Sequence, residues 1–231
     1  HADTSIHSHA FCGAFKVLYG NSLHEEFHTE QRESYSTDTI LNKLTRTKTN
    51  ILVPGSVKPI ERGEEFIHRV VHLSAPTVTL CIRTVADTDI AQWHHFDNGL
   101  SILKKELDES IFKKLFYGDY LFNLTPKLAQ NYTRKFIKSL DNSELMNFFE
   151  QLSVDTMGVS DDYQELIYNT MMSRLSSQAW FHLYEEHCER FQYYSQEQAP
   201  DKLPDELSKF LFHSEFYEYS EDEVKMLTQR F

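Results

Sequence analysis

The fold of this 231-residue sequence is decided by two short stretches, IHSH at residues 6–9 and FIHRV at residues 66–70. Side chains alternate between the two faces of a β-strand, so His7 and His9 point to the same side. A third histidine, His68, can reach them from a strand far along the chain. Three imidazoles in this arrangement predict a facial metal site, which suits iron, zinc, copper or nickel.

The first stretch continues to a glycine at a characteristic distance. The spacing from His7 and His9 to Gly20 resembles the first motif of the cupin superfamily, which runs His-x-His, then Glu, then Gly. Counting back from Gly20 places the glutamate of that motif on Gly13. The glutamate is therefore missing, as it is in the thiol dioxygenases of the cysteine dioxygenase type, which bind iron through three histidines.

The second stretch follows the second cupin motif loosely. That motif runs roughly Pro-x-Gly-x-x-His-x-x-x-Asn, and Pro59, Gly63 and His68 fill its first three fixed positions with extra residues between them. His72 stands where asparagine is usual. The His-Arg-Val of the thiol dioxygenases at the third ligand is matched at residues 68–70. The resemblance covers residues 1–85 and does not extend into the remainder of the chain.

The resemblance implies a cupin-like double-stranded β-helix and a metal centre made by His7, His9 and His68. The expected cofactor is Fe²⁺, with Zn, Ni or Mn as other divalent metals that the same ligands would take. The implied function is a dioxygenase that oxidises a small thiol or amino-acid-like substrate with O₂. Two departures concern the substrate side. Gly13 cannot provide the cysteine of the family's Cys–Tyr crosslink, and the arginine that grips the substrate in animal-type enzymes has no counterpart before His7.

The substrate-contacting triad of the family, Ser-x-His-x-Tyr, aligns with Thr79, Cys81 and Arg83, and none of the three is identical. In a strand these residues share one face, while residues 78, 80 and 82 share the other, where helices could pack. Arg83 would then present a guanidinium fork suited to bidentate capture of a carboxylate. The alternative is a salt bridge of Arg83 at the barrel mouth.

Other histidines are weaker candidates. His72 shares a strand face with His68 and could contact the metal ligands or the substrate, or it could face solvent. His24 and His28 are expected to be exposed. The pair His94-His95 is expected to lie where the barrel meets the rest of the chain.

The chain changes character near residue 97. Short β-rich runs separated by turn signals come first, and they predict a cupin-like β-barrel over residues 1–96. Apolar residues then recur at helical spacing from residue 101 to 116, and the longest helix is expected from about residue 163 to 194. Residues 97–231 thus form a predicted α-helical region, which makes the chain α+β. A barrel whose histidine motif comes so early would lack its first strands, so we expect a longer gene product, or completion of the barrel by other segments or a partner chain.

Composition sets the remaining expectations. A net charge of −12 and a pI near 5.4 argue against nucleic-acid binding. No apolar run is long enough for a membrane span, and no signal peptide is visible. The 3 cysteines are scattered and odd in number, which favours free thiols and a cytoplasmic protein.

The expected partners are a small anionic substrate and O₂, with a homodimer as the possible assembly. Two alternatives stay open: a cupin metalloenzyme with a non-thiol substrate, and a non-enzymatic metal-binding cupin whose helical half docks a partner protein. A 2-oxoglutarate oxygenase fits less well, because that class needs an acidic residue at position 9.

Overall fold

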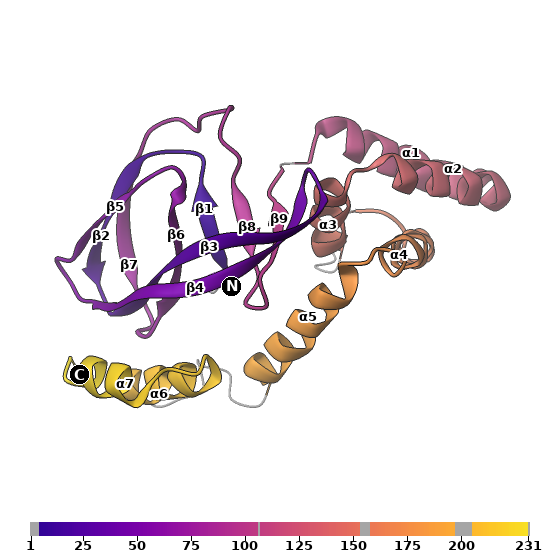
Figure 1. Ribbon diagram of the computed structural model, residues 1–231. Coiled ribbons are helices and arrows are strands. Elements are labelled where there is room, and N and C mark those ends of the chain that lie inside the picture. Colours follow the sequence, from indigo (N-terminus) through magenta and orange to yellow (C-terminus); the bar gives the residue numbers. More distant parts are fainter. Residues whose placement is uncertain (1–4, 106, 153–157, 197–204, 231) are drawn as a thin grey trace.

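The computed structural model describes residues 5–105, 107–152, 158–196 and 205–230, and these form an α+β structure in which strands precede helices (Figure 1). The strands are β1 (Ile6–His9), β2 (Gly13–Tyr19), β3 (Ser22–Ser36), β4 (Thr39–Leu52), β5 (Val57–Ile60), β6 (Gly63–His72), β7 (Val78–Arg83), β8 (Trp93–His95) and β9 (Leu100–Leu103). The helices are α1 (Glu109–Leu124), α2 (Pro126–Ser139), α3 (Asn142–Leu152), α4 (Asp161–Leu175), α5 (Phe181–Gln196), α6 (Glu206–Phe216) and α7 (Glu221–Thr228).

The histidine-bearing strands belong to a closed barrel with the strand order β1-β6-β3-β4-β9-β8, in which all neighbouring strands are antiparallel. β1 pairs with β6 on one side and with β8 on the other, so the ring closes through segments of this chain. β5, β2 and β7 form a second antiparallel sheet. The predicted small β-barrel in an α+β chain is confirmed at this level of description.

The second sheet packs its apolar side chains against the barrel. Phe15 of β2 and Ile60 of β5 are buried together with Phe66 of β6 and Leu52 of β4. These side chains come from strands of both sheets, and they surround the space into which the histidines point. Burying an aromatic or aliphatic side chain of this size stabilises the fold by about 1.5–3 kcal/mol.

Strand β6 has two faces with different partners. Phe66 and His68 point into the barrel, where they join the apolar cluster and the histidine group. Val71, on the other face, packs against Phe210 of α6 and Leu227 of α7. The period-two alternation of a strand therefore places His68 and the contacts to the last two helices on opposite sides of one strand.

The helices form two groups. The larger group, α1 to α5, encloses a core that includes Leu115, Tyr163, Trp180 and other buried apolar residues, and this core continues onto Leu100 and Ile102 of β9. The helices start at ordinary N-terminal signals. Asp108 caps α1 by accepting a hydrogen bond from the Ser110 backbone N–H, and Pro126 occupies the first turn of α2. The smaller group, α6 and α7, lies under the barrel (Figure 1).

Two expectations about the helical half were wrong. Residues 101–103 were expected in a helix but lie in β9, so the strands extend beyond residue 97, and the expected 96/97 boundary falls inside the β8–β9 hairpin. The apolar spacing there suits a helix, but backbone pairing with β4 and β8 decides the conformation. The expected helix over residues 163–194 is two helices, α4 and α5. A turn at residues 176–180 separates them.

Two further properties bear on the expectations from composition. None of the described helices is both long and apolar enough to cross a membrane. Cys12, Cys81 and Cys188 are free thiols, as their odd number and scattered positions predicted.

Candidate metal centre

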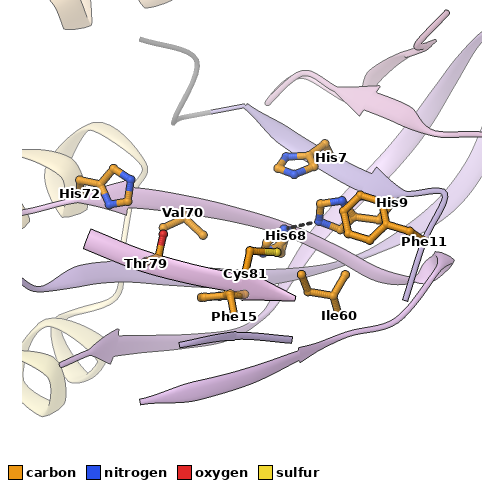
Figure 2. Close-up of a pocket in the computed structure, with 10 residues that line it drawn as sticks. All are labelled: His7, His9, Phe11, Phe15, Ile60, His68, Val70, His72, Thr79 and Cys81. Carbon is orange, nitrogen blue, oxygen red and sulfur yellow. Dashed lines mark hydrogen bonds between the residues drawn. The ribbon is translucent and has the colours of Figure 1, made fainter. Parts of the chain in front are cut away.

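Three histidines converge inside the barrel. His7 and His9 come from β1 and His68 from β6, and His7 and His68 are direct cross-strand neighbours. The strand pairing shifts register between His7 and His9, so both imidazoles can turn toward His68. One ring nitrogen of each residue lies within 4.8 Å of the others, and the three rings point toward one another (Figure 2). The structure thus brings together the three residues that the sequence pattern grouped.

The distances suit a metal ion. The Nε2 atoms of His9 and His68 are 2.9 Å apart. Two metal–nitrogen bonds of about 2.0–2.1 Å that meet at a right angle place the nitrogens about 3 Å apart. Two imidazole nitrogens at this distance share either a proton or a cation. The Nδ1 atom of His9 is buried and has no hydrogen-bond partner among the described residues, so the ring is oriented by the site rather than by a bond on its far side.

Burial keeps these imidazoles in the form that binds metal. Burial is the largest cause that lowers the pKa of His9, to about 4, and the neighbouring His7 lowers it further. Burial likewise lowers the pKa of His7 and of His68. A metal ion needs the neutral imidazole, because protonation removes the lone pair that it would bind. All three side chains are therefore neutral at physiological pH and could bind a metal ion.

The backbone around Gly13 leaves no room for a side chain at this position. A Cβ atom added at Gly13 would lie 2.3 Å from the backbone oxygen of Ile82, because β2 and β7 approach closely there. Neither a glutamate nor a cysteine fits without moving the strand. This position therefore supplies no fourth ligand and no crosslink, as the sequence comparison with the cupin motif indicated.

A pocket of about 240 Å³ adjoins the three histidines (Figure 2). Its lining is mostly apolar and combines residues from both sheets: His7, His9, Phe11, Phe15, Ile60, His68, Val70, His72, Thr79 and Cys81. Thr79 and Cys81 line the pocket from β7. His72 lies at the end away from the three histidines, and its Nδ1 is 2.9 Å from the Ser22 hydroxyl.

Arg83 lies outside this lining. It follows Cys81 on the same face of β7, but it is exposed, and its guanidinium carbon is 4.8 Å from the centre of the Phe11 ring. Because Phe11 lines the pocket, Arg83 sits near its rim. The other face of β7 was expected to be covered by helices. Instead Val78, Leu80 and Ile82 are exposed, since the described helices pack on β9 and on the β3–β6 side.

The burial of His24 differs from the expectation. His24 was expected to be exposed, but it is fully buried, and its Nε2 lies 3.0 Å from Nδ1 of His68. The signal that could have found it is the alternation along β3, in which Ser22 and His24 share the inward face. His28, on the same face, is exposed as expected. The His94-His95 pair lies in β8, and His94 lines a cavity that the α3 residue Glu150 also lines.

Arg69, the residue after His68, lies on the opposite face of β6. Its side chain points away from the three histidines into a buried ion cluster between the barrel and helices α6 and α7. There its Nε donates to the carboxylate of Glu25 at 2.5 Å, and its Nη1 donates to Asp97 at 3.1 Å. Glu25 and Arg69 are both buried. The arginine therefore holds the fold together on the outside of the barrel.

The buried histidines predict that stability falls in mild acid. Burial is the first cause that lowers the pKa of His9, His24 and His94 to about 4 and that of His95 to about 3. Histidines of the unfolded chain have a pKa of about 6.5, so below this pH they bind protons that the buried histidines of the folded chain do not bind. The free energy of unfolding should therefore decrease by up to about 1.4 kcal/mol per pH unit for each such histidine between pH 6.5 and 4.

This decrease can be measured by urea unfolding at pH 7.5, 6.0 and 5.0 in the presence of a chelator. Glu25 does not interfere in this window. Although burial opposes it, Arg69 and His213 hold its pKa below the usual value, so its stabilisation is lost only in stronger acid. A free energy of unfolding that is constant between pH 7.5 and 5.0 would contradict the neutral, buried state of these imidazoles.

No family model, no curated protein and no solved structure matched this chain. The closed small β-barrel and the three-histidine group are compatible with a cupin, and the group could hold a metal ion.

Proposed function

We propose that this chain is an iron-dependent, cupin-like dioxygenase that oxidises a small anionic thiol with O₂. The observation that supports the proposal is the group of three neutral, inward-facing imidazoles beside a pocket with mostly apolar walls. In the proposed reaction both atoms of O₂ are transferred to the sulfur of a thiol, which becomes a sulfinic acid. No other reductant or oxidant is then needed.

The chain's own residues would bind the substrate and exclude water. Ferrous iron on His7, His9 and His68 would supply adjacent positions for a thiolate and O₂. Phe15 and Ile60 wall the pocket with apolar surface, which removes water and strengthens electrostatic interactions inside. The hydroxyl of Thr79 and the thiol of Cys81 lie in the lining and can contact the substrate, and His72 can do so at the far end.

Arg83 is the proposed contact for the anionic end of the substrate. Since it is exposed at the rim, its contribution should be about 1 kcal/mol, as is typical of solvent-screened charge pairs. Arg83→Lys should therefore raise the KM for a carboxylated thiol roughly fivefold, because a point charge cannot form the bidentate pair. The KM for a thiol without a carboxylate should not change. Arg62→Lys, at an exposed arginine paired with Asp87, is the matched control. Equal effects of Arg83→Lys on both thiols would contradict the proposed contact.

The proposal is tested by metal analysis followed by oxygen-uptake measurements. Protein purified without added metal should contain iron, and the iron-loaded protein should consume O₂ with at least one of a panel of small carboxylated thiols. Mass spectrometry of the product should show a gain of two oxygen atoms. Bound metal without O₂ uptake for any thiol would support a metalloenzyme with another substrate. Absence of stoichiometric metal after loading with Fe²⁺ would end the enzymatic proposal.

A further inference from the structure

We propose that His24 is a positioning residue that holds His68 in the tautomer able to bind metal, and that Glu26 supports His24 from the other side. The inference rests on the metal site proposed above and adds to it two residues of β3, the strand next to β6. It also names what they control: the affinity of the site for a divalent metal.

The contact between His24 and His68 is close and completely enclosed. Nε2 of His24 lies 3.0 Å from Nδ1 of His68, and the ring centres are 5.2 Å apart. The side chain of His24 is 0% exposed. Phe15 and Phe66 lie on its sides, with ring-centre distances of 5.9 Å in both cases. The packing leaves His24 no water to replace His68 as its partner.

Metal binding by His68 would determine which nitrogen of each imidazole carries the proton. A neutral imidazole has one nitrogen that donates and one that accepts. Nε2 of His68 faces His9 and must be unprotonated to bind a metal. The proton of His68 is therefore on Nδ1, where it is donated to Nε2 of His24. This assignment leaves the proton of His24 on its Nδ1.

The Glu26 carboxylate lies at ion-pair distance from the nitrogen that carries this second proton. The Oε1 atom of Glu26 lies 3.7 Å from Nδ1 of His24, which is otherwise buried without a hydrogen-bond partner among the described residues. Glu26 is also the cross-strand neighbour of His68, so the three side chains share one face of the β3–β6 pair. Lys58 of β5 donates to the same Oε1 at 3.1 Å and fixes the carboxylate in position. Partners of this kind behind a metal-ligating histidine orient the ring and increase its basicity.

The tautomer can be observed directly. In the zinc-loaded protein, long-range ¹H–¹⁵N correlation spectra of the histidine side chains should show the proton on Nδ1 of both His24 and His68. A proton on Nε2 of His24 would reverse the donor and acceptor, and it would overturn the inference whatever the variants do.

Variants at position 24 separate hydrogen bonding from packing. Leucine fills the space but accepts no hydrogen bond, whereas the amide oxygen of glutamine can accept one from His68. Zinc affinity, measured by competition with a chelating dye, should fall about 10–100-fold in His24→Leu. His24→Gln should stay within a few-fold of the wild type. His28→Leu, on the same face of β3 but exposed, is the matched control and should not change. Equal zinc affinity in His24→Leu and the wild type, or equally weak binding by both variants, would overturn the role of His24.

Glu26 and the metal site itself are tested separately. Glu26→Gln should weaken zinc binding less than His24→Leu, while Glu30→Gln, at an exposed residue of the same strand, should have no effect. A wild-type affinity in Glu26→Gln would overturn the role assigned to Glu26. The variant His9→Ala separates a failure of the role of His24 from a failure of the metal site itself. If His9→Ala abolishes zinc binding and His24→Leu does not alter it, only the present inference fails. If the wild type binds zinc no better than His9→Ala, the proposed metal site fails.

Discussion

Replacing His68 by alanine should lower the affinity of the protein for Fe²⁺ or Zn²⁺ by more than about 100-fold. Loss of a partner behind a metal ligand costs about 10–100-fold, and loss of the ligand itself must cost more. His68 is central to the site because its Nε2 lies 2.9 Å from that of His9, while its ring is 4.8 Å from that of His7. Without it, the two histidines of β1 are left as a bidentate site open to water.

The measurement is metal content after dialysis, together with a competitive zinc titration. His72→Ala is the matched control, because His72 lies four residues further on the same strand and lines the same pocket. Its metal content should remain that of the wild type. Thermal unfolding of the metal-free variants shows whether each is folded. A folded His68→Ala protein that retains stoichiometric metal would rule out the three-histidine assignment.

Replacing Arg69 by methionine should reduce the free energy of unfolding by about 3 kcal/mol, because it removes the nearer cation of the buried Glu25 carboxylate and leaves only Arg46, at 3.7 Å. Glu25 is 0% exposed and Arg69 is 1% exposed. The hydroxyl of Tyr219 donates to Glu25 at 2.5 Å, and Nε2 of His213 lies 3.4 Å from the same carboxylate. The guanidinium of Arg69 also lies over the Tyr217 ring, 3.8 Å from its centre.

Urea unfolding of three variants tests this account. The double variant Arg69→Met with Glu25→Leu should recover much of the loss, because the buried carboxylate is removed together with its nearer cation, while Arg46 keeps Glu223 as a partner. Arg62→Met removes an exposed ion pair with Asp87 and should cost less than about 1 kcal/mol. Folded Arg69→Met protein should still bind metal, since its side chain points away from the histidines. A cost below 1 kcal/mol for Arg69→Met would show that this cluster does not hold α6 and α7 on the barrel.

The sequence was sufficient to group His7, His9 and His68 because strand alternation and motif spacing are local patterns. The same alternation placed Thr79 and Cys81 together in the pocket lining. It could not place Arg83 relative to the rim, because that depends on where β7 ends against Phe11. The expectation for Gly13 followed from spacing, but its physical reason, the close approach of the Ile82 backbone, is visible only in three dimensions.

Other features were harder to predict from sequence patterns. The alternation along β3 puts His24 on the same face as Ser22, but only the position of β3 between β4 and β6 shows that this face points into the barrel. Leu103 begins a run of apolar residues at helical spacing, and only the pairing of residues 101–103 with two other strands places them in β9. The turn that divides α4 from α5 contains neither glycine nor proline, so the usual helix-ending signals are missing there.

The pairing of β1 with β6 and β8 also determines when the three histidines can come together during folding. His9 meets His68 across a separation of 59 residues, and Ser8 accepts a hydrogen bond from the Trp93 backbone across a separation of 85. Pairings this distant form slowly, because a long loop must close before any contact compensates for its lost entropy. The ribosome must therefore release the chain through β6 before His7 and His9 can acquire their third partner, and through β8 before β1 is paired on both sides. The three histidines are thus brought together by the long-range pairing of β1 with β6 and by no local contact.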